Sequence, residues 1–224
     1  MTDTLAVPSV SVGRVQRELA SYCLRLTRWP VLLAGVAGSW LVVWWRAGDV
    51  TTADGAVWLV RSVVALGAVT VVFALDDPSI DMTRALPATR RAVMRVRFAV
   101  GGVALVVSVV PAVLTSWAYL DTSSTLAGVA LEVCVLPALT LSAALVMQRQ
   151  FGISEPAQFV ILVVLGLMMA AQLLGQRWPL LVPPGPEWAE AHWRWAALLL
   201  IAGLVGGWQL RDPASRPLKR FLLR

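Results

Sequence analysis

The sequence is poor in the residues that build most soluble active sites. Charged residues make up 14% of its 224 residues, and it holds a single histidine, His192, which we expect in a loop. One histidine excludes an HExxH zinc motif and disfavours a histidine-based metal site or catalytic triad. The sequence also lacks the GxxxxGK[ST] phosphate-binding motif, and no serine stands in a nucleophile elbow. We therefore expect no catalytic centre, metal or cofactor in this chain.

Cysteine and signal-peptide features are equally sparse. The two cysteines, Cys23 and Cys134, lie far apart, so we expect two free thiols rather than a disulfide. The first thirty residues contain four arginines and lack an apolar core followed by a small-residue cleavage site. We therefore expect the first apolar segment itself to act as the membrane-insertion signal.

Long apolar stretches dominate the rest of the chain. Apolar residue types make up 58% of it, and the mean hydropathy is +0.73. A membrane-spanning helix needs about 20 mainly apolar residues. Six stretches approach this length: 29–45, 56–75, 98–120, 126–147, 157–174 and 195–210. The sequence predicts an all-α integral membrane protein, with one transmembrane domain over residues 1–224.

Basic residues indicate how these spans are oriented. The net charge is +6, with eighteen arginines and one lysine, and fifteen of these residues fall on one side of the predicted spans. They lie in the N-terminal segment, in the second and fourth connections and in the C-terminal tail. The positive-inside pattern predicts that both termini are cytoplasmic, and this placement disfavours nucleic acid as the partner. The preference for arginine over lysine favours a bacterial source, and hence the inner membrane.

A basic amphipathic segment precedes the first predicted span. Residues 9–28 have apolar positions at helical spacing, namely Val12, Val15, Leu19, Tyr22 and Leu26, opposite four arginines and a serine. Such a helix is expected to lie on the surface of the cytoplasmic leaflet. It either anchors the chain to the bilayer or also grips a partner protein, and the sequence leaves both open.

Two charged residues fall inside predicted spans. Arg61 lies about six residues from the outer end of the second span, and Glu132 lies about seven residues from the outer end of the fourth. Since both spans run inward, a rise of about 1.5 Å per residue puts them at nearly the same depth. A charge within a bilayer is costly unless it is paired or hydrated. We expect an Arg61–Glu132 pair, either structural or lining a substrate path; the alternative is that each side chain reaches the headgroups separately.

A polar segment, LDDPSIDMTRALPATRRAVMRVR, separates the second and third predicted spans. Asp76-Asp77-Pro78 is expected to stop the second span and to cap a new short helix. Residues 79–86 then predict an amphipathic turn or two, with Ile80, Met82 and Leu86 as apolar positions, and Pro87 ends it. This segment would lie on the cytoplasmic surface between two spans, either as a docking element or as a plain interfacial segment.

This layout resembles the membrane subunits of ABC-2-type ABC transporters. In that family an acidic residue, a coupling helix and a P-x-[ST]-R element contact the ATPase between spans two and three. The resemblance assigns the acid to Asp76 or Asp77 and the P-x-[ST]-R element to Pro87, Thr89 and Arg90. It implies that Ile80, Leu86 and Arg91 belong to the same contact. It also implies that residues 9–28 are the elbow helix and that 175–194 occupies the position of short re-entrant helices.

The resemblance implies a permease subunit, expected to act in export. It would work with a separate ATP-binding subunit, which would hold the ATP and Mg²⁺, and with a second copy or a related permease. The alternative is a non-transporting scaffold or sensor subunit that recruits a cytoplasmic protein through the same surface. An intramembrane enzyme is disfavoured, because few polar groups converge within the spans.

Overall fold

The computed structural model describes residues 12–76, 90–120, 123–173 and 180–211 of the chain. All regular structure in these ranges is helical. The helices are α1 (Val12–Leu26), α2 (Trp29–Arg46), α3 (Ala53–Phe73), α5 (Arg90–Ser116), α6 (Ser123–Gln150), α7 (Ala157–Leu173) and α8 (Trp188–Gln209), with 3-10 turns at Ala47–Asp49 and Trp117–Tyr119.

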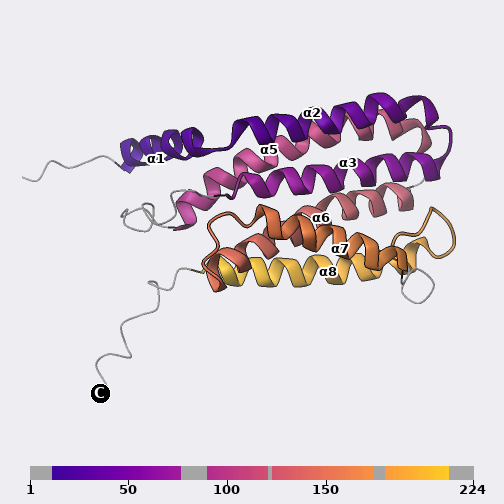
Figure 1. Cartoon of the computed structure of the whole chain (residues 1–224). Helices are drawn as coiled ribbons and strands as arrows, with labels where there is room; N and C mark the ends of the chain where they lie inside the picture. Colours follow the sequence, from indigo (N-terminus) through magenta and orange to yellow (C-terminus); the bar gives the residue numbers. More distant parts are fainter. Residues whose placement is uncertain (1–11, 77–89, 121–122, 174–179, 212–224) are drawn as a thin grey trace, which may run out of the picture.

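The six helices after α1 lie side by side along a common direction (Figure 1). α2, α3 and α5 form one half of the bundle, and α6, α7 and α8 form the other. The helix α1, the end of α3, the α6–α7 connection and the end of α8 meet at one end of the bundle, which we call the α1 end. The turns of α1 are foreshortened in this view, whereas those of α2 are not, so α1 runs at an angle to α2.

Four of these helices are long and apolar enough to cross a membrane: α2, α3, α5 and α6. The fifth and sixth predicted spans are helical, but they fall short of this standard. α7 has 17 residues, which is about 26 Å of helix against an apolar bilayer core of about 30 Å. The first turns of α8 carry Glu190 and Arg194, which leaves a shorter uncharged stretch. Within the described residues the chain thus has four helices that could cross a membrane, as expected of a membrane protein.

Two helices begin before the apolar stretches that they contain. The third predicted span starts at residue 98, and α5 begins at Arg90, so the basic residues before the apolar stretch are already helical. The sixth predicted span starts at residue 195, and α8 begins at Trp188. In both cases a polar first part extends the helix beyond its apolar part, where hydropathy does not show it.

The helix α3 is the centre of the bundle. It contacts α2, α5, α6 and α7, and it is the most buried of the four long apolar helices. Its approach to α2 is close because Gly35 faces Thr70: a Cβ atom at Gly35 would lie 2.1 Å from the Thr70 Oγ1 atom. Small residues let transmembrane helix backbones come together in this way.

Pro111 interrupts the hydrogen bonds of α5, and α2 compensates for it. Proline has no N–H, so the carbonyl of Val107, four residues earlier, loses its usual helical donor. The Trp40 indole Nε1 of α2 donates to this carbonyl at 3.0 Å. The break in α5 therefore becomes a contact that joins two helices.

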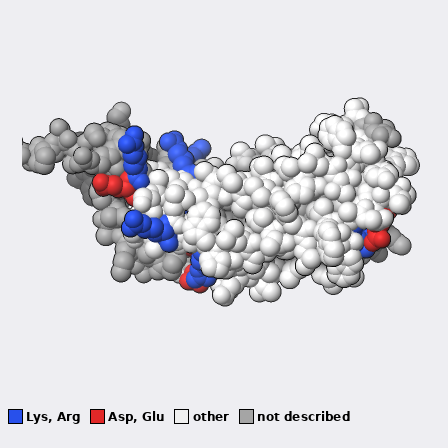
Figure 2. Space-filling view, turned by 90° about the horizontal axis from the view of Figure 1, so that it is seen from above, with Lys and Arg blue, Asp and Glu red and all other residues white. Residues whose placement is uncertain are grey.

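The sides of the bundle are apolar outside as well as inside. Exposed residues on α2, α5, α7 and α8 include Leu33, Leu41, Val103, Leu114, Leu162, Leu165, Leu200 and Leu204. On the face seen in Figure 2, charged side chains gather near the two ends and the middle is uncharged. Exposed apolar surface of this extent is typical of a protein that faces lipid.

Candidate functional site

The structure brings Arg61 and Glu132 together at the end of the bundle opposite α1. The guanidinium of Arg61 on α3 donates twice to the carboxylate of Glu132 on α6: Nε to Oε2 and NH2 to Oε1, both at 2.7 Å. Both side chains are buried. This fork-to-fork geometry is the strongest form of an arginine–carboxylate contact.

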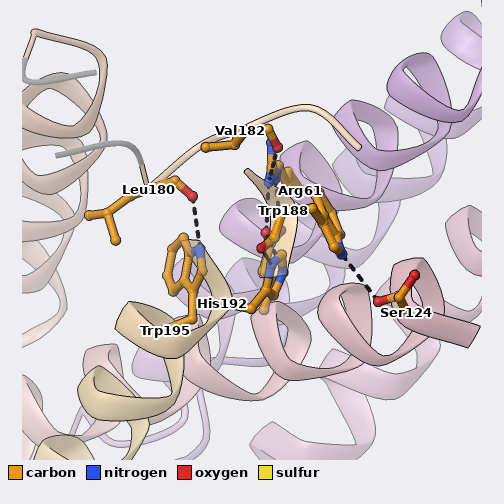
Figure 3. Close-up of polar contacts among 8 residues, drawn as sticks. Arg61, Ser124, Leu180, Val182, Trp188, His192 and Trp195 are labelled. Carbon is orange, nitrogen blue, oxygen red and sulfur yellow. Dashed lines mark hydrogen bonds and ion pairs between the residues drawn. The ribbon is translucent and has the colours of Figure 1, made fainter. Parts of the chain in front are cut away.

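The Val182 carbonyl and the Trp188 indole cover part of the remaining surface of the Arg61 guanidinium (Figure 3), and the Trp58 indole covers another part. NH2 also donates to the Val182 carbonyl at 2.9 Å. The guanidinium carbon lies 5.3 Å from the ring centroid of Trp58 and 5.7 Å from that of Trp188. The NH1 atom of this guanidinium has no hydrogen-bond acceptor among the described residues, so the cation–π contacts help to stabilise its charge.

His192 is the third charged or titratable member of this group, and its expected position in a loop was wrong. It lies in the second turn of α8, where Nδ1 donates to the Trp188 carbonyl at 2.6 Å. Nε2 lies 3.2 Å from Glu132 Oε1, without the alignment of a hydrogen bond. We call Arg61, Glu132 and His192 the Arg61 cluster.

The Arg61 cluster joins three helices and one connecting segment. Arg61 comes from α3, Glu132 from α6 and His192 from α8, while Val182 belongs to the irregular residues 180–187. A pocket of about 390 Å³ lies beside it, but Trp188 lines that pocket and neither Arg61 nor Glu132 does. In this conformation the arrangement holds the bundle together and offers neither charge to a ligand.

A second polar group lies at the α1 end, around the buried Asp76. Its Oδ1 accepts a hydrogen bond from the backbone N–H of Ala157, the first residue of α7, at 3.1 Å. Its Oδ2 lies 3.7 Å from Arg28 NH1 at the start of α2, and Arg28 NH2 also pairs with Glu155. Asp76 therefore caps α7 from 81 positions away in the sequence.

Two further side chains hold the chain just after α3. Arg97 on α5 donates from NH1 to the carbonyls of Leu75 and Asp76, at 3.0 and 2.8 Å. Gln148 on α6 donates to the Leu75 carbonyl at 2.7 Å. We call Arg28, Asp76, Arg97, Gln148 and Glu155 the Asp76 cluster. It links α2, α3, α5, α6 and α7 at the point where the 77–89 connection begins.

The other residues of the expected docking segment are placed less fully. Asp77, Ile80, Leu86, Pro87 and Thr89 lie outside the described residues. Arg90 and Arg91 form the start of α5. Asp76, one of the two candidates for the family's acidic residue, points into the bundle and is used by internal contacts.

Comparison with known proteins finds no relative. No family model matches the chain, and neither a curated protein nor a solved structure matches it. Among the residues that the structure describes, no group of three metal-binding side chains could hold a metal ion. The two clusters and the apolar surface are the features of the described residues that bear on function.

Burial raises the pKa of Asp76 from 3.8 to about 6, against the opposing effects of the Ala157 N–H and of Arg28 and Arg97. Between these two values the folded protein holds the proton that the unfolded chain releases, so stability falls as pH rises through that window. Asp76→Asn keeps an acceptor oxygen and removes the charge. We expect the thermal midpoint of the variant, relative to wild type, to rise from pH 4 to pH 6 and to level off above.

The control for this pH experiment is Asp49→Asn, which changes an exposed carboxylate at the opposite end. Its difference from wild type is expected to stay nearly constant over the same range, because exposed ion pairs contribute little. A difference between Asp76→Asn and wild type that does not change with pH would show that Asp76 is not forced to ionise in a buried site.

Proposed function

We propose that the chain is a permease subunit of an ATP-driven transporter of the ABC-2 type, working in export. The complex would contain a separate ATP-binding subunit, which binds ATP and Mg²⁺, and a second copy or a related permease. The chain would cross a bacterial inner membrane six times, with α7 and α8 as its fifth and sixth spans. Both termini would then be cytoplasmic, and the α1 end would face the ATPase.

The Asp76 cluster is the observation that carries this proposal. An ATPase can move the spans of a permease only if its docking segment is firmly connected to them. The 77–89 connection begins directly after Asp76, and the cluster ties that point to α2, α5, α6 and α7 through hydrogen bonds and ion pairs. A push on the connection would therefore reach five helices rather than one.

Two other features support the same reading. The amphipathic helix α1 precedes the first span. The chain changes direction between α1 and α2 at Arg28, whose backbone is not helical. The P-x-[ST]-R element at Pro87, Thr89 and Arg90 leads directly into α5. Both agree with the arrangement that the family resemblance implies.

The docking segment can be tested by charge reversal. We expect Asp77→Lys combined with Arg90→Glu to leave expression and membrane insertion near the wild-type level, because both positions lie outside the apolar stretches, where a change of charge seldom costs more than about 0.5 kcal/mol. Docking of a short helix depends on a few anchors and on local charge. The double variant should therefore lose most of its co-purifying ATPase subunit, and the ATPase activity of the complex should fall with it.

The matched control is Asp49→Lys combined with Arg46→Glu. These residues form an exposed ion pair at the opposite end, so the same types of charge are reversed far from the docking segment. The control should keep the partner. Normal binding and hydrolysis by the Asp77–Arg90 variant would contradict the proposal, and a stable partner without ATPase activity would favour a scaffold or sensor subunit instead.

A further inference from the structure

Two neighbouring hollows share one residue, Trp29, at the junction of α1 and α2. The first has a volume of about 530 Å³ and is lined by α1, with Arg17, Ser21 and Arg25 among its residues. The second has a volume of about 410 Å³ and lies between α2 and α5. The Trp29 indole donates to the Leu24 carbonyl at 2.8 Å, which fixes the ring between the two hollows.

The hollow along α1 is basic on one side. Arg17, Ser21 and Arg25 are four residues apart, so they form a single stripe on the helix. Both guanidiniums are exposed, and within the described part of the chain neither forms an ion pair with a carboxylate. The only acid on α1, Glu18, lies about 100° round the helix from Arg17. The stripe therefore offers two cations and a hydroxyl to an external group.

The hollow between α2 and α5 is almost wholly apolar. Its walls include Leu32, Leu33 and Val36 of α2 and Val100, Val103 and Ala104 of α5. The small side chain of Ala104 leaves room between the two helices. The groove begins at Trp29 and extends about 10 Å along the side of the bundle, at the depth of the apolar spans.

We infer that the two hollows together bind one anionic phospholipid. The lipid phosphate would lie against Arg17, Ser21 and Arg25, and one acyl chain would fill the groove between α2 and α5. Charge decides this occupant: a cationic stripe joined to an apolar groove at a membrane surface complements an anionic headgroup with its chain. A second protein helix would bury the groove but would leave two arginines without a partner. This inference requires residence in a membrane and does not depend on the proposed transport function.

Native mass spectrometry of the purified full chain tests the site. The protein would be titrated in detergent with phosphatidylglycerol and with phosphatidylcholine of the same acyl chains. Each arginine near an anionic headgroup contributes about 1 kcal/mol, so we expect one phosphatidylglycerol to bind roughly tenfold or more tightly than phosphatidylcholine. Arg17→Gln combined with Arg25→Gln should remove this preference. The matched control Arg211→Gln, an exposed arginine after α8, should keep it.

A second pair of variants tests the acyl-chain groove. Ala104→Phe fills the groove and should weaken the binding of both lipids by about tenfold, whereas Val106→Phe, on an exposed face of the same helix outside the groove, should not. The inference is overturned by equal affinity of wild type for both lipids, or by an unchanged preference in the double arginine variant. It is also overturned if water-soluble glycerol phosphate competes at the same concentration, or if a dimer covers the groove and binds no lipid.

Discussion

Arg61→Leu and Glu132→Leu are each expected to lower the free energy of unfolding by about 3–5 kcal/mol, and the double change is expected to cost less than either. Each single change leaves a buried charge without its partner. The remaining group then has to be desolvated alone, which costs more than the ion pair contributes. The double change removes both charges and fills the space with two apolar side chains. The bidentate geometry and the burial of both side chains make this coupling large.

Equilibrium unfolding in mixed micelles with a rising fraction of SDS would measure these free energies. The control cycle uses Arg46→Leu and Asp49→Leu, whose pair is exposed and 3.6 Å apart. Its single changes should stay within about 0.5 kcal/mol of wild type and should add. Simple additivity in the Arg61–Glu132 cycle would show that the two charges are stabilised separately by their other contacts.

The closeness of Arg61 and Glu132 could be predicted because it depends on one regular quantity. Both residues lie a known number of positions from the ends of apolar stretches, and a helix rises by a fixed distance per residue. The positions of the apolar stretches therefore predict the relative depth of the two residues. They do not predict the contacts of Arg61 with the Val182 carbonyl and the Trp188 indole, because these residues belong to a later connection and to α8.

The helical position of His192 could be predicted from the spacing of the residues around it, which a hydropathy average does not show. Trp188, Ala191, His192 and Trp195 are all buried, at positions i, i+3, i+4 and i+7 of α8. That spacing is the apolar stripe of a helix, and Glu190 and Arg194 form an i, i+4 ion pair on another face. The nearby prolines and charged residues made the segment resemble a loop, and the first two turns of α8 were missed.

The role of Asp76 could not be predicted from local sequence. An acid followed by a proline favours a cap for the helix that follows it, and Asp76 was assigned to such a cap. In the structure its carboxylate caps α7 and contacts Arg28, while the segment that follows Asp76 lies outside the described residues. Both contacts join residues that are distant in the sequence, so only the packing of α2, α3 and α7 brings them together.

Among the described glycines of α6, α7 and α8, Gly128 of α6 leaves the least room for a side chain. A Cβ atom there would lie 2.5 Å from His192 Nε2 and 2.6 Å from the Trp188 ring, and both residues belong to α8. Gly128→Ala therefore forces two rigid rings to move, and it is expected to cost about 2–3 kcal/mol of unfolding free energy. The shift should also break the hydrogen bond from Trp188 Nε1 to the Ser124 carbonyl.

Gly203→Ala on α8 separates this packing cost from the intrinsic preference of a helix for alanine. No atom of the described residues lies within 4 Å of a Cβ atom at Gly203, so the same change there should stabilise the protein by up to about 1 kcal/mol. The two glycine changes are therefore expected to have opposite signs in the SDS unfolding experiment. A stabilising Gly128→Ala would mean that α6 and α8 are further apart than described. The contact between His192 and Glu132, which needs the same close approach, would then be lost as well.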